Sequence, residues 1–295
     1  MSRALRILRH DPTFWLGGGL VAFLAFITLF APLIAPYDPL EQFRDAIPAS
    51  GDPAGPSDRF SLGTDRSGRD YLSRLLFGAR TSLVIGIGAN VIATTLGLLV
   101  GAGAGLIGRV RIRLPFGASV SIPVESILMR VTDLWLSFPV LLLTITMAFV
   151  FGPSVGLVLI VIAITLWTST ARIVYGRTLV LKQAEFVEAS TAIGTSPPMI
   201  FFRHLLPHLL PLLVVYASLG IAATILFEAT LSYLGAGVPP PTPTWGTMLA
   251  DHISWFATDP RLVVLPGVCI TVTVLAFNLL GDALRGALDP RTREH

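Results

Sequence analysis

Residues 185–211, EFVEASTAIGTSPPMIFFRHLLPHLLP, are the stretch of sequence from which we infer the fold. They form a structured polar segment in a chain whose other parts are mostly long apolar runs. Residues 185–193 read as a short helix, and Gly194 is a natural residue to end it. A second short helix is expected over about residues 196–206. The stretch is therefore a helix–turn–helix loop between membrane segments.

The second helix of this loop has its own start and stop signals. Ser196 can cap it, and Pro197 suits its first position, where a missing N–H has no cost. Pro207 marks its expected end. We expect one side of this helix to be apolar, formed by Met199, Phe202, Leu205 and Leu206. So short a helix must pack on another surface to be stable. That surface can belong to its own chain or to a separate partner, and the local sequence favours neither.

Composition places the chain in a membrane. It has 295 residues, of which 53% are hydrophobic and only 13% are charged, whereas soluble domains carry about 25% charged residues. We therefore expect an all-α polytopic membrane protein. The net charge of +3 is small, and the scattered basic residues are more typical of topology signals than of a nucleic-acid footprint. The single cysteine, Cys269, excludes a disulfide within the chain and a thiol-based metal cluster.

Six apolar runs are long enough to cross a bilayer, which takes about 20 residues. The first could also be a signal peptide, but it is too long and lacks a small-residue cleavage site. We therefore expect six transmembrane helices, at about residues 14–37, 82–107, 124–151, 155–174, 212–235 and 262–284.

These runs divide the chain into five parts. They are a cytoplasmic tail (1–13), the first transmembrane helix (14–37), an extracytoplasmic loop (38–81), a five-helix core that includes the 185–211 loop (82–284), and a cytoplasmic tail (285–295). Within the extracytoplasmic loop, Ser67 can cap an amphipathic helix, with Asp70 as its acidic partner. We expect this helix to lie on the membrane surface and to lead into the next span.

The same loop contains Gly63 and Gly68 at the spacing of a phosphate-binding loop. Arg69 and Asp70 stand where that motif requires Lys and Ser or Thr. The chain therefore has no ATP-binding loop of this kind.

Orientation follows from basic residues near the span ends, which favour the cytoplasmic side. With the N-terminus inside, the short outer connections carry only Arg261. The exception is the first outer loop, with Arg44, Arg59, Arg66, Arg69, Arg74 and Arg80. The inner side carries Arg3, Arg6, Arg9, Arg109, Arg111, Arg113, Arg177, Lys182, Arg203, Arg285, Arg291 and Arg293. We expect both termini and the 185–211 loop in the cytoplasm.

Few polar groups lie inside the spans. Glu228 is a candidate for a pathway or gating group, because a charge in a span is expensive; it could equally be bonded to a neighbouring span. Asn278 is a second pathway candidate.

Other charged residues read as structural. Arg130 and Asp133 are spaced to pair on one helix face, and Asp282 and Arg285 are expected to pair or to contact the loop. His204 and His208 have helical spacing without a third ligand nearby, so we expect no metal site.

The loop carries a known pattern. It resembles the EAA loop of ABC importer permeases, which reads Glu-Ala-Ala, then Gly four residues later, then Ile-x-Leu-Pro. Two positions depart from that pattern: Ser190 replaces the second Ala, and His204 stands in place of Ile. The second departure is typical of the peptide-transporter branch. The matching residues are Glu188, Ala189, Ser190, Gly194, Leu206 and Pro207.

Four further segments resemble the C-type dipeptide and oligopeptide permeases. Any one of them is weak, but together they occur in order and at the right places relative to six spans. They are residues 42–45, 62–75, 239–248 (PPPTPTWGTM) and 276–290 (AFNLLGDALRGALDP). The resemblance thus covers nearly the whole chain.

The resemblance implies a type I ABC importer permease of the bacterial inner membrane, without catalytic residues or cofactors of its own. Its expected partners are lipid, a B-type second permease, two ATPase subunits that hold ATP and Mg²⁺, and an extracytoplasmic binding protein. Glu188, Ala189, Ser190, Gly194, His204, Leu206 and Pro207 would couple this chain to an ATPase. The implied cargo is di- or oligopeptides, with nickel complexes, glutathione or oligosaccharides as alternatives.

Two other classes fit less well. A secondary transporter driven by an ion gradient would need a relay of intramembrane acid and base groups, and the spans supply mainly Glu228. An intramembrane enzyme would need a Ser/His, paired Asp or His-rich metal set, which the spans lack.

Overall fold

The computed structural model describes every residue except 1, 49–50, 114–118, 153 and 289–295, so parts of both predicted tails lie outside it. Within the described residues, helices account for almost all regular structure. They are α1 Ser2–His10, α2 Pro12–Ile34, η1 Arg44–Ala46, α3 Tyr71–Ile107, α4 Val124–Ser137, α5 Val140–Phe151, α6 Val155–Lys182, α7 Glu185–Ala192, α8 Pro197–Ile200, η2 Phe201–Leu205, α9 Leu206–Tyr233, α10 Trp245–His252, η3 Ile253–Trp255 and α11 Arg261–Leu288.

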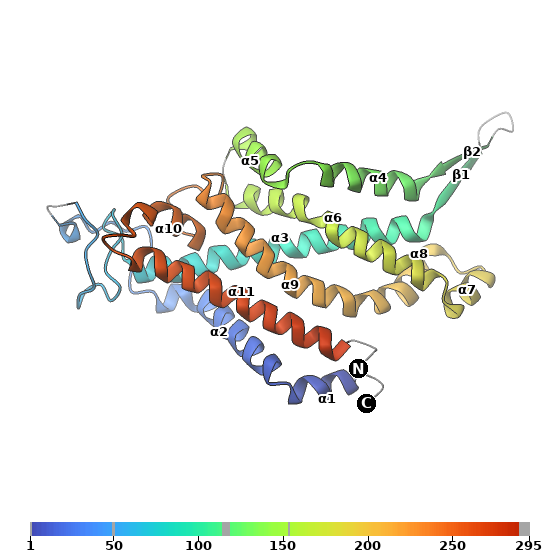
Figure 1. Ribbon diagram of the computed structural model, residues 1–295, viewed down its shortest axis with the longest axis horizontal. Helices are drawn as coiled ribbons and strands as arrows, with labels where there is room; N and C mark the ends of the chain where they lie inside the picture. The colour runs from blue at the N-terminus through green and yellow to red at the C-terminus, as the bar shows by residue number, and fades with distance from the viewer. Residues whose placement is uncertain (1, 49–50, 114–118, 153, 289–295) are drawn as a thin grey trace.

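One hairpin interrupts this helical fold, and the sequence did not predict it. Strands β1 Arg109–Arg113 and β2 Ser119–Pro123 pair antiparallel, with Val110 opposite Ile122. The hairpin projects from the end of the helical bundle (Figure 1). Its alternation of basic and β-branched residues, RVRIR, is a strand signal. The same arginines also favour the cytoplasmic side of the membrane.

Five helices of the described chain are long and apolar enough to cross a membrane, and a bent pair, α4 with α5, brings the number to six if it counts as one span. The prediction of one continuous third span over residues 124–151 is therefore wrong. The two helices meet at 85°. Pro139 lacks an N–H and forces the preceding residue out of the helical region, and Phe138 is indeed extended (φ −79°, ψ 136°).

The path of the chain still fits six crossings. In Figure 1, α1 and the end of α11 lie toward the same end of the molecule as α7 and the hairpin. Helix α10 and the loop that follows α2 lie at the opposite end (Figure 1). α4 and α5 together return the chain from the hairpin to the α10 end, as one crossing does.

The extracytoplasmic helix predicted to begin at Ser67 is not a separate element. Helix α3 begins at Tyr71 and runs unbroken for 37 residues. Its N-cap is Asp70, whose carboxylate accepts a hydrogen bond from the Ser73 N–H at 2.8 Å. Asp70 and Arg74 are buried instead of lying on a solvated face. Arg74 pairs with Asp65, and Asp70 bonds the Ser73 N–H and hydroxyl group through Oδ2.

Helices α3 and α6 pack closely along a row of small residues. A Cβ placed on Gly101 would lie 2.3 Å from the Ala171 carbonyl oxygen, and one on Gly97 would lie 2.6 Å from Cβ of Thr170. Gly105 likewise lies against Thr178. Small residues at four-residue spacing thus allow the backbones to approach, as in other membrane helix pairs.

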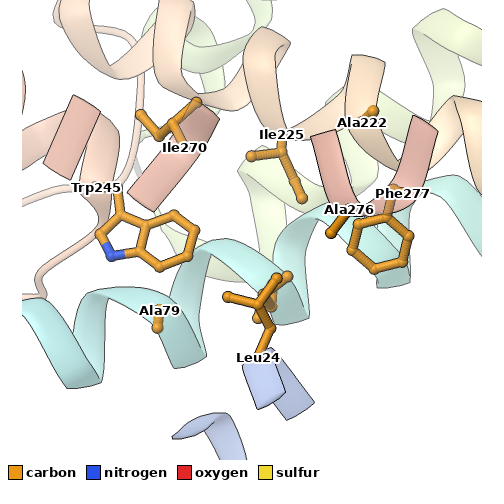
Figure 2. Close-up of a cluster of buried hydrophobic side chains, with 9 residues drawn as sticks. Leu24, Ala79, Ala222, Ile225, Trp245, Ile270, Ala276 and Phe277 are labelled. Atoms are coloured by element: carbon orange, nitrogen blue, oxygen red, sulfur yellow. The ribbon is translucent and has the colours of Figure 1, made fainter. Parts of the chain in front are cut away.

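A central apolar cluster joins the helices that are distant in sequence. The cluster includes Leu24 of α2, Ala79 of α3, Ile225 of α9, Phe277 of α11 and Trp245 of α10 (Figure 2). The Trp245 indole N–H donates to the Leu75 carbonyl oxygen at 3.1 Å. This cluster fixes α10 against the membrane helices, because Trp245 is both buried and hydrogen-bonded.

Candidate functional site

The first half of the 185–211 loop folds as the sequence predicts. Helix α7 ends at Ala192, and Gly194 follows in the left-handed region with φ of 79°. The Gly194 N–H donates to the Thr191 carbonyl oxygen at 3.0 Å, and the Thr195 N–H donates to Ser190 at 3.0 Å. A glycine is required here for its backbone conformation, since the space around its position is open.

The second half differs from the prediction. Ser196 and Pro197 begin α8 as expected, although the Ser196 side chain makes no cap hydrogen bond. The helix does not end at Leu206 but passes through the π-helical turn η2 into α9, so that residues 197–233 form one 37-residue helix. The Leu206 N–H donates to Phe201, one residue further back than in an α-helix. This wider turn lets the helix continue past Pro207.

The apolar side predicted for the second helix is divided between core and surface. Ile200, Leu205 and Leu209 are buried with Val187 of α7 against α6, and Leu206 is partly buried. Met199 and Phe202 point outward instead, with exposed fractions of 53% and 66%, and Ile193 at the turn is 83% exposed. The loop thus packs on its own chain along one side and presents apolar side chains on the other (α7 and α8, Figure 1).

A contact within the loop joins the two residues that depart from the EAA pattern. Ser190 Oγ donates to the Phe186 carbonyl oxygen at 2.8 Å and lies 3.1 Å from His204 Nε2. Because the Ser190 hydrogen is used, Nε2 is assigned as the donor. The Phe186 ring stacks on His208 with centroids 5.1 Å apart. We call Phe186, Ser190, His204 and His208 the loop clasp.

The remaining loop residues named from the sequence lie at the surface. Glu188, Ala189, Gly194 and Pro207 are exposed. These residues, with Ser190 and His204, belong to α7, the turn after it and the start of the 197–233 helix, and α7 lies at the end of the molecule opposite α10 (Figure 1). The structure therefore brings this set together as one accessible element.

Glu228 and Asn278 lie elsewhere, within α9 and α11. Glu228 is fully buried and accepts hydrogen bonds from Ser232 Oγ at 2.8 Å and from Ser82 Oγ of α3 at 3.3 Å. Ser82 Oγ in turn accepts a hydrogen bond from the backbone N–H of Trp245 at 3.2 Å. Hydrogen bonds thus connect Glu228 of α9 to α3 directly and to α10 through Ser82. This arrangement corresponds to the alternative in which Glu228 is bonded to a neighbouring span. Asn278 is partly buried, and a pathway role for either residue stays a prediction.

Two ion pairs expected from spacing are absent among the described residues. Asp133 pairs across to Arg172 of α6 at 2.6 Å and not with Arg130. The reason is tertiary: α4 lies along α6, where Tyr175 also donates a hydrogen bond to Glu125. Asp282 and Arg285 likewise form no ion pair with each other in this part of the chain.

Comparison with known proteins assigns the chain to a family. The family model described as the binding-protein-dependent transport system inner membrane component matches residues 112–294. The chain belongs to this family. A second model, the N-terminal transmembrane domain of oligopeptide transport permease C, matches residues 1–53.

Relatives are similar over nearly the full length. The chain is 42% identical over 282 residues to the di/tripeptide transport system permease protein DppC of Pseudomonas aeruginosa, covering 94% of this chain and 88% of that protein. It is 40% identical to the dipeptide permease DppC of Escherichia coli K12, covering 93% and 87%. The glutathione permease GsiD of Pectobacterium atrosepticum is 38% identical, covering 94% and 86%.

A solved structure has the same fold. A chain of the inward-facing MetNI methionine ABC transporter superposes with a TM-score of 0.57 at 19% identity, covering 73% of this chain and 97% of that one. The protein is thus an all-α, multi-pass inner-membrane permease with the fold of ABC importer permeases, and it works with other ABC subunits.

Proposed function

We propose that this chain forms half of the pathway by which an ABC importer moves di- or oligopeptides inward across the bacterial inner membrane. The observation that carries the proposal is the 42% identity to a di/tripeptide permease over 94% of the chain. Glutathione is the second candidate cargo, since a glutathione permease is 38% identical over a similar length. Nickel complexes and oligosaccharides are the remaining alternatives.

The 185–211 loop is the proposed contact with an ATPase subunit. It supplies an exposed carboxylate at Glu188 and exposed apolar side chains at Ile193, Met199 and Phe202. Its helices are fixed to α6 and α9, so movement of the loop would be passed to the membrane helices. Leu206 and Pro207 lie where the loop joins α9.

The loop's role can be tested by Gly194→Asp. The side chain would project into open space that a partner fills, and a residue with a Cβ strains the left-handed turn. We expect the variant to insert in the membrane but to lose ATP-driven transport. Normal transport by this variant would show that the loop does not couple the two subunits.

The proposed assembly contains a B-type second permease, two ATPase subunits and an extracytoplasmic binding protein. ATP and Mg²⁺ would be held by the ATPase subunits, so that this chain is not an enzyme and carries no cofactor. Both termini and the loop would face the cytoplasm, in agreement with the Arg and Lys distribution and with the shared end of α1, α7 and α11 (Figure 1).

The cargo is tested by purifying the complex with its binding protein and measuring ATPase activity with a ligand panel. Dipeptides and tripeptides are expected to stimulate hydrolysis. Stimulation by glutathione alone would favour the second candidate, and stimulation by nickel complexes but not by peptides would overturn the peptide assignment.

A further inference from the structure

Two sequence segments outside the 185–211 loop line one cavity. Residues 62–75 and 239–248 are far apart in sequence, yet both line a cavity of about 310 Å³. This is at the low end of the range for small-molecule sites, which is about 300–1,000 Å³. Its lining includes Thr247, Ala250 and Asp251 of α10, and α10 lies at the end of the molecule opposite α7 (Figure 1).

Arginines form one wall of this cavity. Arg69 and Arg74 are only 9% and 2% exposed and share the carboxylate of Asp65. The Arg69 Nε lies 2.6 Å and the Arg74 Nε 3.3 Å from Asp65 Oδ2. This ion network holds both guanidinium groups in fixed positions, which is what recognition of an anion requires.

The network leaves donors unused. Arg74 Nη1 donates to the Pro39 carbonyl oxygen at 3.4 Å, but neither Arg74 Nη2 nor the Nη1 and Nη2 of Arg69 has a hydrogen-bond partner among the described residues. Guanidinium groups bind carboxylates through such paired N–H groups. Asp70, the remaining acid of this segment, uses its Oδ2 on Ser73.

An acid stands on another wall. Asp251 of α10 lines the cavity with Thr247 and Ala250. Its charge interacts with that of Arg74, but its carboxylate makes no hydrogen bond or close ion pair within the described chain. The rest of the lining includes the 239–242 segment, whose prolines offer carbonyl oxygens but no N–H. The cavity therefore combines arginine N–H groups that have no acceptor with a carboxylate that has no donor among the described residues.

We propose that this cavity is a binding site for a short zwitterionic peptide, whose carboxylate is bound by Arg69 and Arg74 and whose ammonium group is bound by Asp251. The proposal rests on the proposed function, because it takes the cargo of the importer as the ligand. It adds a site on the permease itself, at the extracytoplasmic end, that distinguishes free peptide ends from blocked ones.

The test uses the complete importer in nanodiscs without its binding protein. Equilibrium dialysis measures the binding of ¹⁴C-labelled Ala-Ala, of N-acetyl-Ala-Ala and of Ala-Ala-amide. Since charge-assisted hydrogen bonds are lost when either end is blocked, we expect Ala-Ala to bind about tenfold tighter than each blocked form.

Variants assign each end of the peptide. Asp251→Asn should bind Ala-Ala and N-acetyl-Ala-Ala alike, because the group that senses the ammonium is gone. Arg69→Lys keeps the charge but loses paired donors, so it should lose discrimination against Ala-Ala-amide. Asp58→Asn, the same change in an exposed loop outside the cavity, is the matched control and should discriminate as the wild type does.

The outcomes separate this site from the function on which it rests. The site is overturned if the wild type binds no Ala-Ala at millimolar concentrations, or if Asp251→Asn discriminates as the wild type does. In both cases Ala-Ala uptake with the binding protein present still decides the proposed function. If the complete importer takes up no peptide, the proposed function fails, whatever the cavity binds.

Discussion

Two residues of the 185–211 loop depend on each other. Ser190 and His204 are the two positions that depart from the general EAA pattern, and their side chains are in contact at 3.1 Å. In the sequence, Ser190 and His204 are two separate exceptions to the EAA pattern. The contact explains them together, since a histidine at 204 finds an acceptor only if residue 190 carries a hydroxyl group.

We predict that Ser190→Ala and His204→Ile each lower the number of peptides transported per ATP hydrolysed. Each removes one half of a hydrogen bond worth about 1 kcal/mol and leaves its partner unpaired. The double variant removes both polar groups and should transport better than His204→Ile alone.

The measurement is uptake and ATP hydrolysis in proteoliposomes. Ser196→Ala is the control in the same loop, because the Ser196 side chain makes no cap hydrogen bond. Additive losses in the double variant would show that the two residues act independently.

A buried histidine at the other end of the molecule gives a pH dependence. Burial lowers the pKa of His252 below its ordinary value of 6.5, and Arg74 acts in the same direction; the hydrogen bond to Met248, Asp65 and Asp251 oppose it. The unfolded state then binds the proton more tightly than the folded state. Stability is therefore full above pH ~6.5 and falls as the pH drops below it.

We predict that thermal unfolding of the complex in nanodiscs shifts to lower temperature between pH 7 and pH 5, and less so in His252→Gln. Glutamine can still donate to the Met248 carbonyl oxygen, which His252 Nδ1 contacts at 2.8 Å, but it does not titrate. His10→Gln, an exposed histidine in α1, serves as control. Equal pH slopes in wild type and His252→Gln would contradict this account.

Among the elements, the pair α3 and α6 depends most on backbone contact. Their interface is built on glycines whose Cβ positions are filled by the partner helix. Gly103, on the same helix, has open space around its Cβ position. The chain thus contains a test position and a control two residues apart.

We predict that Gly101→Ala destabilises the complex by about 1–3 kcal/mol, because the added methyl group overpacks the interface. Gly103→Ala should be neutral or slightly stabilising, since alanine favours a helix. Thermal unfolding of both variants in the same nanodiscs measures the difference. Equal stability of the two variants would mean that the α3–α6 contact is looser than described.

Elements were predictable where a local signal decides them. Gly194 and Pro197 determine the turn of the 185–211 loop and the start of its second helix. Tertiary contacts overrode local signals elsewhere. Asp133 pairs with Arg172 of α6 and not with Arg130, which is nearer in sequence. The helix continues past Pro207 because a π-helical turn precedes it.

For the molecule as a whole, apolar run length predicted the number of crossings but not their shape. Run length alone could not show the bend at Pro139, because α4 and α5 together are long and apolar enough to count as one span. Nor could it show that residues 62–75 and 239–248 meet, since nothing local links them. The residues proposed to couple the chain to an ATPase were named from their resemblance to a loop pattern. The arginines of the cavity lie in a segment whose sequence predicts an amphipathic helix on the membrane surface.

The central claim is that this chain belongs to an importer driven by ATP on partner subunits. The most direct measurement is uptake of labelled Ala-Ala by proteoliposomes that contain the complete importer and its binding protein, with ATP or an ion gradient as the only energy source. We predict accumulation with ATP and none with the gradient alone. Accumulation driven by the gradient without ATP would contradict the account.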